Sequence, residues 1–268
     1  MTHPLDGPRG KVERTNEHVQ NLQLEVQTFL NLNPYGVVLN RDPQTGEEVA
    51  SARVSQDPPF RLGLIVGDAV HNLRSALDHL MYQLVLANGG KPDTWTEFPV
   101  VWEAEKWNSK KYKAAGTKKQ KGASIAVVDA IERLQPYKRG NKFREDPLWH
   151  IHEFDVRDKH RFINVVGCAL RRQSFSLGLA PRQGEGSVKS LNFTMGGPQV
   201  ISPLKDGTEL SRTTIEEATN VQMDREFTFD VAFEQGGAGQ GEPIIPTLTQ
   251  FADYVAGVLD AFESHFPP

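Results

Sequence analysis

Five stretches of the chain place hydrophobic residues at the three- and four-residue spacing of an amphipathic helix. They predict helices over residues 12–32, 61–87, 124–137, 148–161 and 246–268. Before the fourth stretch, Asp146 is a suitable N-cap and Pro147 suits a first helical position. Helices therefore dominate the first 161 residues, and one more closes the chain.

Other stretches favour β-structure. Residues 35–41 and 47–55 are strand-like and flank the turn sequence DPQTG, which predicts a hairpin over residues 35–56. Short strands are predicted at 162–170, 174–180, 188–195 and 226–234. The predicted fold is α+β: an antiparallel helical core with a β-hairpin insertion, a C-terminal antiparallel sheet and a closing helix. We expect the regions 1–161, 162–245 and 246–268 to form one compact unit.

The helix predicted at 61–87 has an unusual polar face. Its core stripe consists of Leu62, Val66, Ala69, Leu73, Ala76, Leu77, Leu80 and Leu84. The opposite face is polar without a Lys or a Glu, and it carries Asp68, His71, Asn72, Ser75, Asp78, His79 and Tyr82, with Arg74 at its border. These side chains hydrogen-bond, titrate or bind ions. The face is therefore suited either to packing against a second helix that satisfies its polar groups or to forming an active site.

The helix predicted at 148–161 is the natural partner of this face. We expect its apolar stripe to consist of Trp149, Val156 and Ile163, with His152 and Lys159 inside or beside the stripe and Asp155 at its edge. Buried charges need partners, which the face of residues 61–87 supplies. One interpretation is therefore a structural network that includes an ion pair between Arg74 and Asp78, four residues apart.

Composition narrows the class of protein. With 38% hydrophobic and 24% charged residues, the chain is typical of a soluble globular protein. It has no apolar run long enough for a bilayer and no signal-like start, so we expect a cytoplasmic protein without a membrane partner. The single cysteine, Cys168, allows no internal disulfide and lies in a predicted buried strand.

Positive charge is concentrated in residues 106–144, where twelve Lys or Arg face only Asp129 and Glu132. The segment has a net charge of +10 in a chain whose total is −4. Lysines interleaved with aromatic residues favour RNA binding, and the candidates are Lys110, Lys111, Tyr112, Lys118 and Lys119. The alternative is a solvated loop.

A zinc site is a less favoured interpretation of the same residues. His71, Asp78, His152 and Asp155 are ligand types that zinc accepts. However, the chain has no HExxH motif and no cysteine pair, and His71 and His79 point about 80° apart on a helix. We therefore expect no metal and no cofactor.

The segment RSALDH, Arg74 to His79, resembles the R-x4-6-H motif of the HEPN superfamily, metal-independent ribonucleases of toxin and antiviral defence systems. The resemblance implies that Arg74 binds the scissile phosphate, that His79 is the acid or base, and that two copies form a homodimer. The chain departs from the motif in having Ser75 after the Arg. On a straight helix, Arg74 and His79 also point about 140° apart.

A longer resemblance joins GDAVHNLRSALDHL and DPLWHIHEFDVRDKHR to a widespread group of bacterial proteins, often actinobacterial, and implies no activity. Our leading hypothesis is a HEPN-like endoribonuclease that acts on RNA through Arg74 and His79. The groups expected to orient these two are His71, Asp78, His152, Asp155 and Lys159. The alternative is a non-enzymatic structural or partner-binding protein in which the same network is structural.

Overall fold

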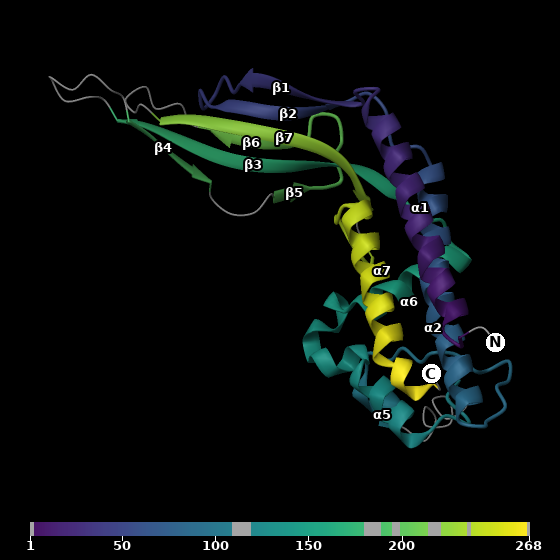
Figure 1. Cartoon of the computed structure of the whole chain (residues 1–268). Coiled ribbons are helices and arrows are strands. Elements are labelled where there is room, and N and C mark those ends of the chain that lie inside the picture. The colour runs from purple at the N-terminus through teal and green to yellow at the C-terminus, as the bar shows by residue number, and fades with distance from the viewer. Residues whose placement is uncertain are drawn as a thin grey trace. The chain divides into compact units, whose positions relative to one another are not determined.

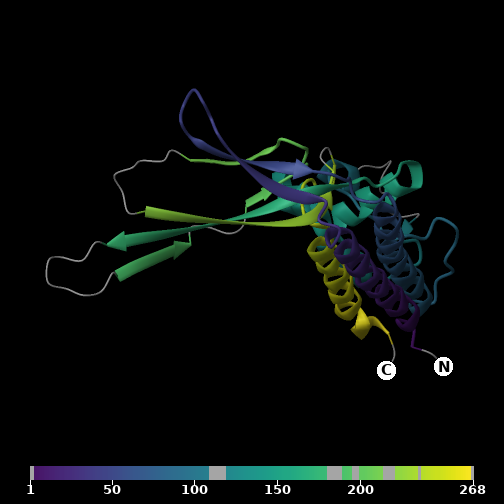
Figure 2. The same cartoon turned by 90° about the horizontal axis from the view of Figure 1, so that it is seen from above.

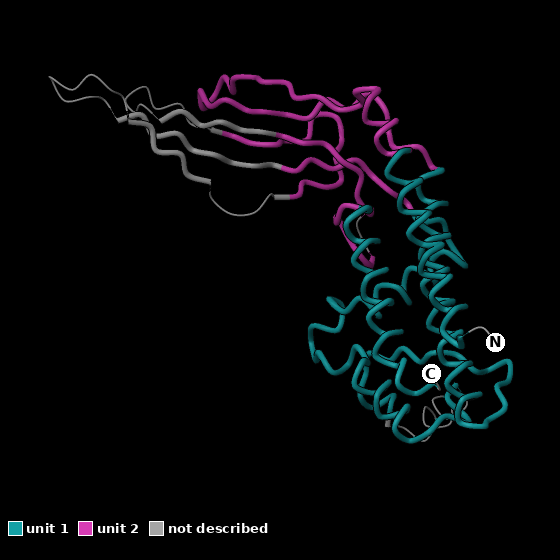
Figure 3. The backbone as a smooth tube through the Cα atoms, in the orientation of Figure 1, with its two compact units in different colours: residues 1–24, 61–163, 244–268 teal, residues 25–60, 164–243 magenta. Residues whose placement is uncertain are grey.

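The computed structural model describes residues 3–108, 119–179, 189–194, 199–213, 221–234 and 237–266. The chain divides into two compact units (Figure 3). The first unit comprises residues 1–24, 61–163 and 244–268, and the second comprises residues 25–60 and 164–243. Unlike the division expected from the sequence, the hairpin groups with the later strands and the closing helix groups with the other helices.

The first unit is helical (Figure 1). Its long helices are α1 (Asp6–Leu30, whose last six residues belong to the second unit), α2 (Arg61–Ala87), α6 (Pro147–His160) and α7 (Ile244–Ala261). The shorter helices are α3 (Ala104–Asn108), α5 (Ile125–Arg133), η1 (Pro136–Glu145) and η2 (Glu263–His265). Among the described residues no helix is both long and apolar enough to cross a membrane.

Helix α2 is the centre of this unit, because α6 and α7 both pack against it. All eight residues of the predicted stripe, Leu62, Val66, Ala69, Leu73, Ala76, Leu77, Leu80 and Leu84, are buried. On the α1 side, the Thr15 hydroxyl donates a hydrogen bond to the Ala69 carbonyl at 3.2 Å. The N-cap prediction is also confirmed, since the Asp146 carboxylate accepts a hydrogen bond from the Leu148 N–H.

Two glycines let α2 lie close to α6 and the residues that follow it. A Cβ at Gly63 would overlap the backbone oxygen of Ile163, and a Cβ at Gly67 would overlap the Asp158 carboxylate. Each glycine therefore allows an oxygen atom to lie against the helix backbone, because the Cβ of any other residue would occupy that space.

The second unit contains two antiparallel sheets (Figure 2). The hairpin of β1 (Tyr35–Arg41) and β2 (Glu48–Val54) pairs Tyr35 with Val54, and β6 (Glu209–Thr213) adds to β2. In the other sheet, β3 (Val165–Leu179) pairs with β4 (Lys189–Thr194), β5 (Gln199–Ile201) and β7 (Val221–Phe233).

The α+β class is confirmed, but the strand predictions are only partly right. The separate strands expected at 162–170 and 174–180 are one continuous strand, β3, because β7 pairs with it from Val165 to Leu177. The short strands β5 and β6 had no counterpart in the prediction. Both are held by hydrogen bonds to strands distant in sequence, which a local pattern does not reveal.

We predict that Gly63→Ala lowers the free energy of unfolding by about 2 kcal/mol, because the new methyl group meets the Ile163 backbone, which cannot rotate away. Gly10→Ala in α1 is the matched control, since nothing lies within 4 Å of its Cβ position. Its higher helix propensity should raise stability by about 0.5–1 kcal/mol. Urea unfolding measures both, and equal effects would contradict the close approach.

Candidate functional site

Arg74 is buried in α2, with its side chain 5% exposed, and holds a neighbouring segment in place. Its Nη2 donates to Asp78 Oδ1 at 2.7 Å and to the Phe98 carbonyl at 2.6 Å. The Phe98 N–H donates in turn to Asp78 Oδ1 at 2.9 Å. We call this set of Arg74, Asp78 and Phe98 the Arg74 clamp. It confirms the ion pair expected between Arg74 and Asp78 and fixes the chain around residue 98 to α2.

The clamp contains an ion pair between a buried arginine and a partly exposed aspartate. Burial raises the pKa of Asp78, while the Arg74 charge and the Phe98 N–H favour its ionised form and offset part of that effect. Glu97 Oε2 lies 3.7 Å from Arg74 Nη2, and Glu97 also binds Lys119 Nζ at 2.5 Å. Arg74 Nη2 therefore has three oxygen neighbours from its own chain, those of Asp78, Phe98 and Glu97.

His152 on α6 lies in the same region and is held in its neutral form. Burial, assisted by the charges of Arg74 and Lys119, lowers the pKa of His152 to about 4. Its ring centroid is 5.9 Å from that of Trp102. His152 Nδ1, like Arg74 Nη1, is a buried atom with no hydrogen-bond partner among the described residues.

A second cluster is centred on Asp155 of α6, whose side chain is 3% exposed. Its Oδ1 lies 3.0 Å from Nδ1 of His71 on α2, and its Oδ2 accepts a hydrogen bond from Lys159 Nζ at 2.6 Å. His71 and Lys159 remain 55% and 54% exposed. Polar side chains of the helix predicted at 148–161 do meet the polar face of the helix at 61–87, here through His71 and Asp155. We call Asp155, His71 and Lys159 the Asp155 cluster.

Further carboxylates flank this cluster. Asp158 packs against Gly67, and its pKa is raised by partial burial and by the negative charges of Asp68 and Asp155, although His71 acts in the opposite direction. At the next residue along α2, Lys11 Nζ of α1 donates to Asn72 Oδ1 at 3.3 Å. His71 itself lies beside the carboxylates of Asp155 and Asp158 on α6.

Arg74 and His79 do not come together within one chain. Helix α2 is continuous from Arg61 to Ala87, His79 is exposed, and its ring lies near Gly7 of α1. Arg74 faces Phe98 instead. Their pairing across two copies of the chain stays a prediction.

The buried face of α6 differs from the predicted stripe of Trp149, Val156 and Ile163. The buried residues of the helix are Leu148, Ile151, Phe154 and Asp155. Val156 is 39% exposed, and Ile163 is buried but lies beyond the helix end at His160. The stripe prediction was wrong because it counted only apolar residues as buried. The face that is buried includes the charged Asp155, whose carboxylate is bound by His71 and Lys159.

The basic segment is partly neutralised by its own neighbours. Lys106 pairs with Glu103, Lys138 with Glu132, Arg139 with Asp146, Lys142 with Glu145, and Lys119 with Glu97. The other candidate RNA-binding residues, Lys110, Lys111, Tyr112 and Lys118, lie outside the described residues. In the described part of the segment these cations are therefore already engaged with carboxylates.

In the part of the chain that the structure describes, no three His, Cys, Asp or Glu side chains are placed to hold a metal ion. Compared with known proteins, the chain matches no family model, no curated protein sequence and no solved structure.

The sequence did not predict the contacts that the Phe98 backbone, Lys11 and Trp102 make with Arg74, Asn72 and His152, respectively. Their sequence neighbourhoods contain no motif, and only the folded chain brings them to α2 and α6.

We predict that Arg74→Ala lowers the free energy of unfolding by about 3 kcal/mol, because Asp78 loses its counter-charge and the Phe98 carbonyl loses its donor. The matched control is Arg14→Ala, which removes an exposed ion pair with Glu17 on α1. That change should cost at most about 0.5 kcal/mol. Chemical denaturation measures both values, and an equally small loss in Arg74→Ala would argue against the clamp.

Stability should also depend on pH through His152. Its folded pKa of about 4 lies below the unfolded value of 6.5, so the unfolded chain binds more protons between these values. Stability should therefore fall by about 2–3 kcal/mol as the pH drops from 6.5 to 4.

His152→Gln should flatten this part of the stability curve, whereas the exposed His79→Gln should not, because it leaves His152 in place. Unfolding curves recorded at several pH values provide the measurement. A wild-type slope that survives in His152→Gln would assign the pH dependence to other groups.

Proposed function

We propose that this protein is a metal-independent endoribonuclease in which His71, held by Asp155, is the acid–base group. The observation that carries the proposal is the 3.0 Å contact of His71 Nδ1 with a buried carboxylate, while the imidazole remains 55% exposed. A histidine that is fixed on one side and open to solvent on the other is arranged for proton transfer.

The carboxylate decides which nitrogen of His71 is available. An ionised Asp155 can only accept hydrogen bonds, so His71 Nδ1 carries the proton and Nε2 keeps a lone pair. Asp155 thereby orients the ring and stabilises the imidazolium formed when Nε2 takes a proton. In this proposal Asp155 is a positioning residue and His71 is the catalytic residue.

Lys159 supplies positive charge next to His71, because it binds the same carboxylate at 2.6 Å and is half exposed. Lys11 of α1 contacts Asn72, the next residue along α2. An RNA backbone that reaches His71 would therefore meet the Lys159 ammonium group, and one that extends toward Asn72 would meet Lys11. Such charges favour a phosphodiester and the extra negative charge of its transition state.

The reaction would proceed as an internal displacement at phosphorus. His71 Nε2 takes the proton of the ribose 2′-hydroxyl, and the O2′–P bond forms as the P–O5′ bond breaks. The leaving 5′-oxygen receives a proton from the Lys159 ammonium group. The products are a 2′,3′-cyclic phosphate and a 5′-hydroxyl, and solvent then restores both protonation states.

The Arg74 clamp favours a structural role for Arg74, one of the two residues that the HEPN resemblance selects. Arg74 is 4% exposed and bonded to Asp78 and Phe98, which supports positioning of a chain segment and not contact with RNA. If the Asp155 cluster is structural as well, the protein is a non-enzymatic binding or scaffold protein. Activity assays separate these alternatives.

We predict that the purified protein cleaves labelled single-stranded RNA in the presence of EDTA and leaves cyclic phosphate ends. His71→Ala should lower the rate by at least about 100-fold, because no other group replaces the base. Lys159→Met should lower it by about 10-fold or more through loss of charge and of the proton donor. Asp155→Asn should lower kcat more than it raises KM.

The controls are His160→Ala, an exposed histidine on α6, and His79→Ala. Both should cleave at the wild-type rate, and thermal unfolding should show that every variant is folded. Activity lost in His79→Ala but retained in His71→Ala would replace the proposal with the HEPN pairing. Absence of cleavage by the folded wild type would favour the non-enzymatic alternative.

A further inference from the structure

Strand β1 forms an open edge of its sheet (Figure 1). The strand order is β1–β2–β6, so among the described strands β1 has a hydrogen-bonded neighbour on one side only. Apolar side chains are exposed along it: Val37 and Val38 are each 40% exposed, and Leu39 is 61% exposed. Proteins usually protect such an edge with a lysine, a proline or a bulge, and β1 has none of these. The edge is therefore open to another strand.

The hydrogen-bond register shows which backbone groups this edge offers. Val37 lies opposite Ala52 of β2. The Ala52 N–H donates to the Thr208 carbonyl, and the Ala52 carbonyl accepts from the Gly207 N–H, both on the β6 side of β2. The Val37–Ala52 pair is therefore not hydrogen-bonded, since bonded and non-bonded pairs alternate along an antiparallel ladder. The N–H and carbonyl groups of Val37 and Leu39 consequently point away from β2, toward the open edge.

The side chains of these two residues continue a buried apolar surface. Val37 and Leu39 lie opposite Ala52 and Ala50 of β2, which are 2% and 1% exposed. Opposite residues of an antiparallel pair share one face of the sheet, so the apolar surface extends across β1 and ends uncovered at the edge. A further strand with aliphatic residues at alternate positions would extend this surface and reduce its exposure.

β1 itself has this pattern, and an antiparallel copy of it fits the edge. A two-fold axis through Val38, perpendicular to the sheet, places Val37 opposite the second copy's Leu39, and Leu39 opposite its Val37. The outward backbone groups of these residues then exchange hydrogen bonds, and the aliphatic pairs lie on the same face. We propose that two copies of this chain pair through β1, which joins their three-stranded sheets into one continuous sheet.

The charge of β1 favours this antiparallel arrangement of two copies. Arg41 is the only charged residue of the strand. In the proposed register it lies opposite Tyr35 of the second copy, so the two Arg41 residues are six positions apart along the strands, about 20 Å. A parallel copy would instead place the two arginines side by side. All of β1 belongs to the second unit, whereas the Asp155 cluster belongs to the first, so the dimer does not depend on the proposed ribonuclease activity.

The contact should form a weak dimer, because a pair of seven-residue strands is smaller than the standard interface of about 1,600 Å². Sedimentation velocity of the full chain, from low to high micromolar concentration, should show a monomer–dimer equilibrium. Leu39→Pro should raise the dissociation constant by at least about 10-fold, because it removes an outward N–H and leaves the hydrogen bonds between β1 and β2 in place. Ile125→Ala, which removes an 81% exposed side chain from α5, is the control and should dimerise as the wild type does.

A cysteine variant tests the register. The two Val38 residues would form a non-hydrogen-bonded pair with Cα atoms about 4.5 Å apart, which suits a disulfide. Val38→Cys should therefore give a disulfide-linked dimer under mild oxidation. Ser51→Cys, opposite Val38 on β2, is the matched control. It should stay monomeric on a denaturing gel, because three strand spacings, about 14 Å, would separate its two copies.

Thermal unfolding should show that each variant is folded. A wild-type chain that stays monomeric at every concentration would overturn the proposal and leave the edge to a strand of another protein. A dimer that persists unchanged in folded Leu39→Pro would place the contact on a different surface. Cross-linking of Ser51→Cys as efficient as that of Val38→Cys would likewise overturn the pairing through β1.

Discussion

The burial of α2 among α1, α6 and α7 is the constraint on which the helical unit depends. Fifteen of its 27 residues are buried, and one of them is the charged Arg74. A charge in that position requires partners, because an unpaired buried guanidinium would cost several kcal/mol. Asp78 and the Phe98 carbonyl supply them. The packing of α2 therefore determines where the chain around residue 98 must lie.

The same constraint has a different outcome at Asp155. This carboxylate is buried as deeply as Arg74, but its partners His71 and Lys159 are half exposed. In the clamp, Arg74 Nη2, Asp78 and the Phe98 backbone bind one another, and Arg74 Nη1 has no partner among the described residues. The Asp155 cluster instead presents an imidazole edge and an ammonium group to solvent. Only the second arrangement leaves polar atoms available to a substrate, which is why the proposed chemistry lies with His71.

Much of α2 could be predicted because its signals are local. Its bounds, its buried stripe and the Arg74–Asp78 pair all follow from helical spacing, since residues four apart are neighbours on a helix. The expectation that polar side chains of α6 meet the polar face of α2 followed from a different argument, namely that buried polar groups need partners. The structure realises it as the contact of His71 with Asp155.

The elements that local patterns did not reveal depend on distant contacts. Strand β6 exists because it pairs with β2, and β3 remains unbroken because β7 runs along it. The face of α6 was misjudged because hydrophobicity alone places Asp155 outside the core, and its burial becomes favourable only when His71 is already beside it. The partner of Arg74 at Phe98 is a backbone carbonyl, which side-chain patterns do not encode.

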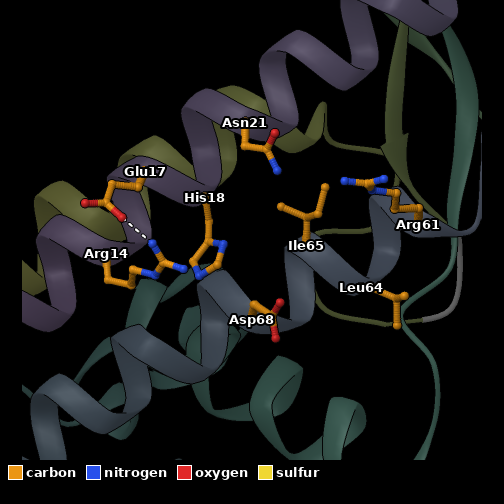
Figure 4. Close-up of a pocket in the computed structure, with 8 residues that line it drawn as sticks. All are labelled: Arg14, Glu17, His18, Asn21, Arg61, Leu64, Ile65 and Asp68. Carbon is orange, nitrogen blue, oxygen red and sulfur yellow. Dashed lines mark hydrogen bonds and ion pairs between the residues drawn. The ribbon is translucent and has the colours of Figure 1, made fainter.

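The absence of Lys and Glu from the polar face of α2 now has a physical explanation. Long, flexible side chains lose more conformational entropy when they are fixed than Asp, His or Asn do. At Gly67 the helix lets Asp158 approach with no side chain between them, and the short carboxylate of Asp68 lines a pocket between α1 and α2 (Figure 4). A face built from short polar groups can hold carboxylates and an imidazole at defined positions, which a solvated face of lysines and glutamates would not do.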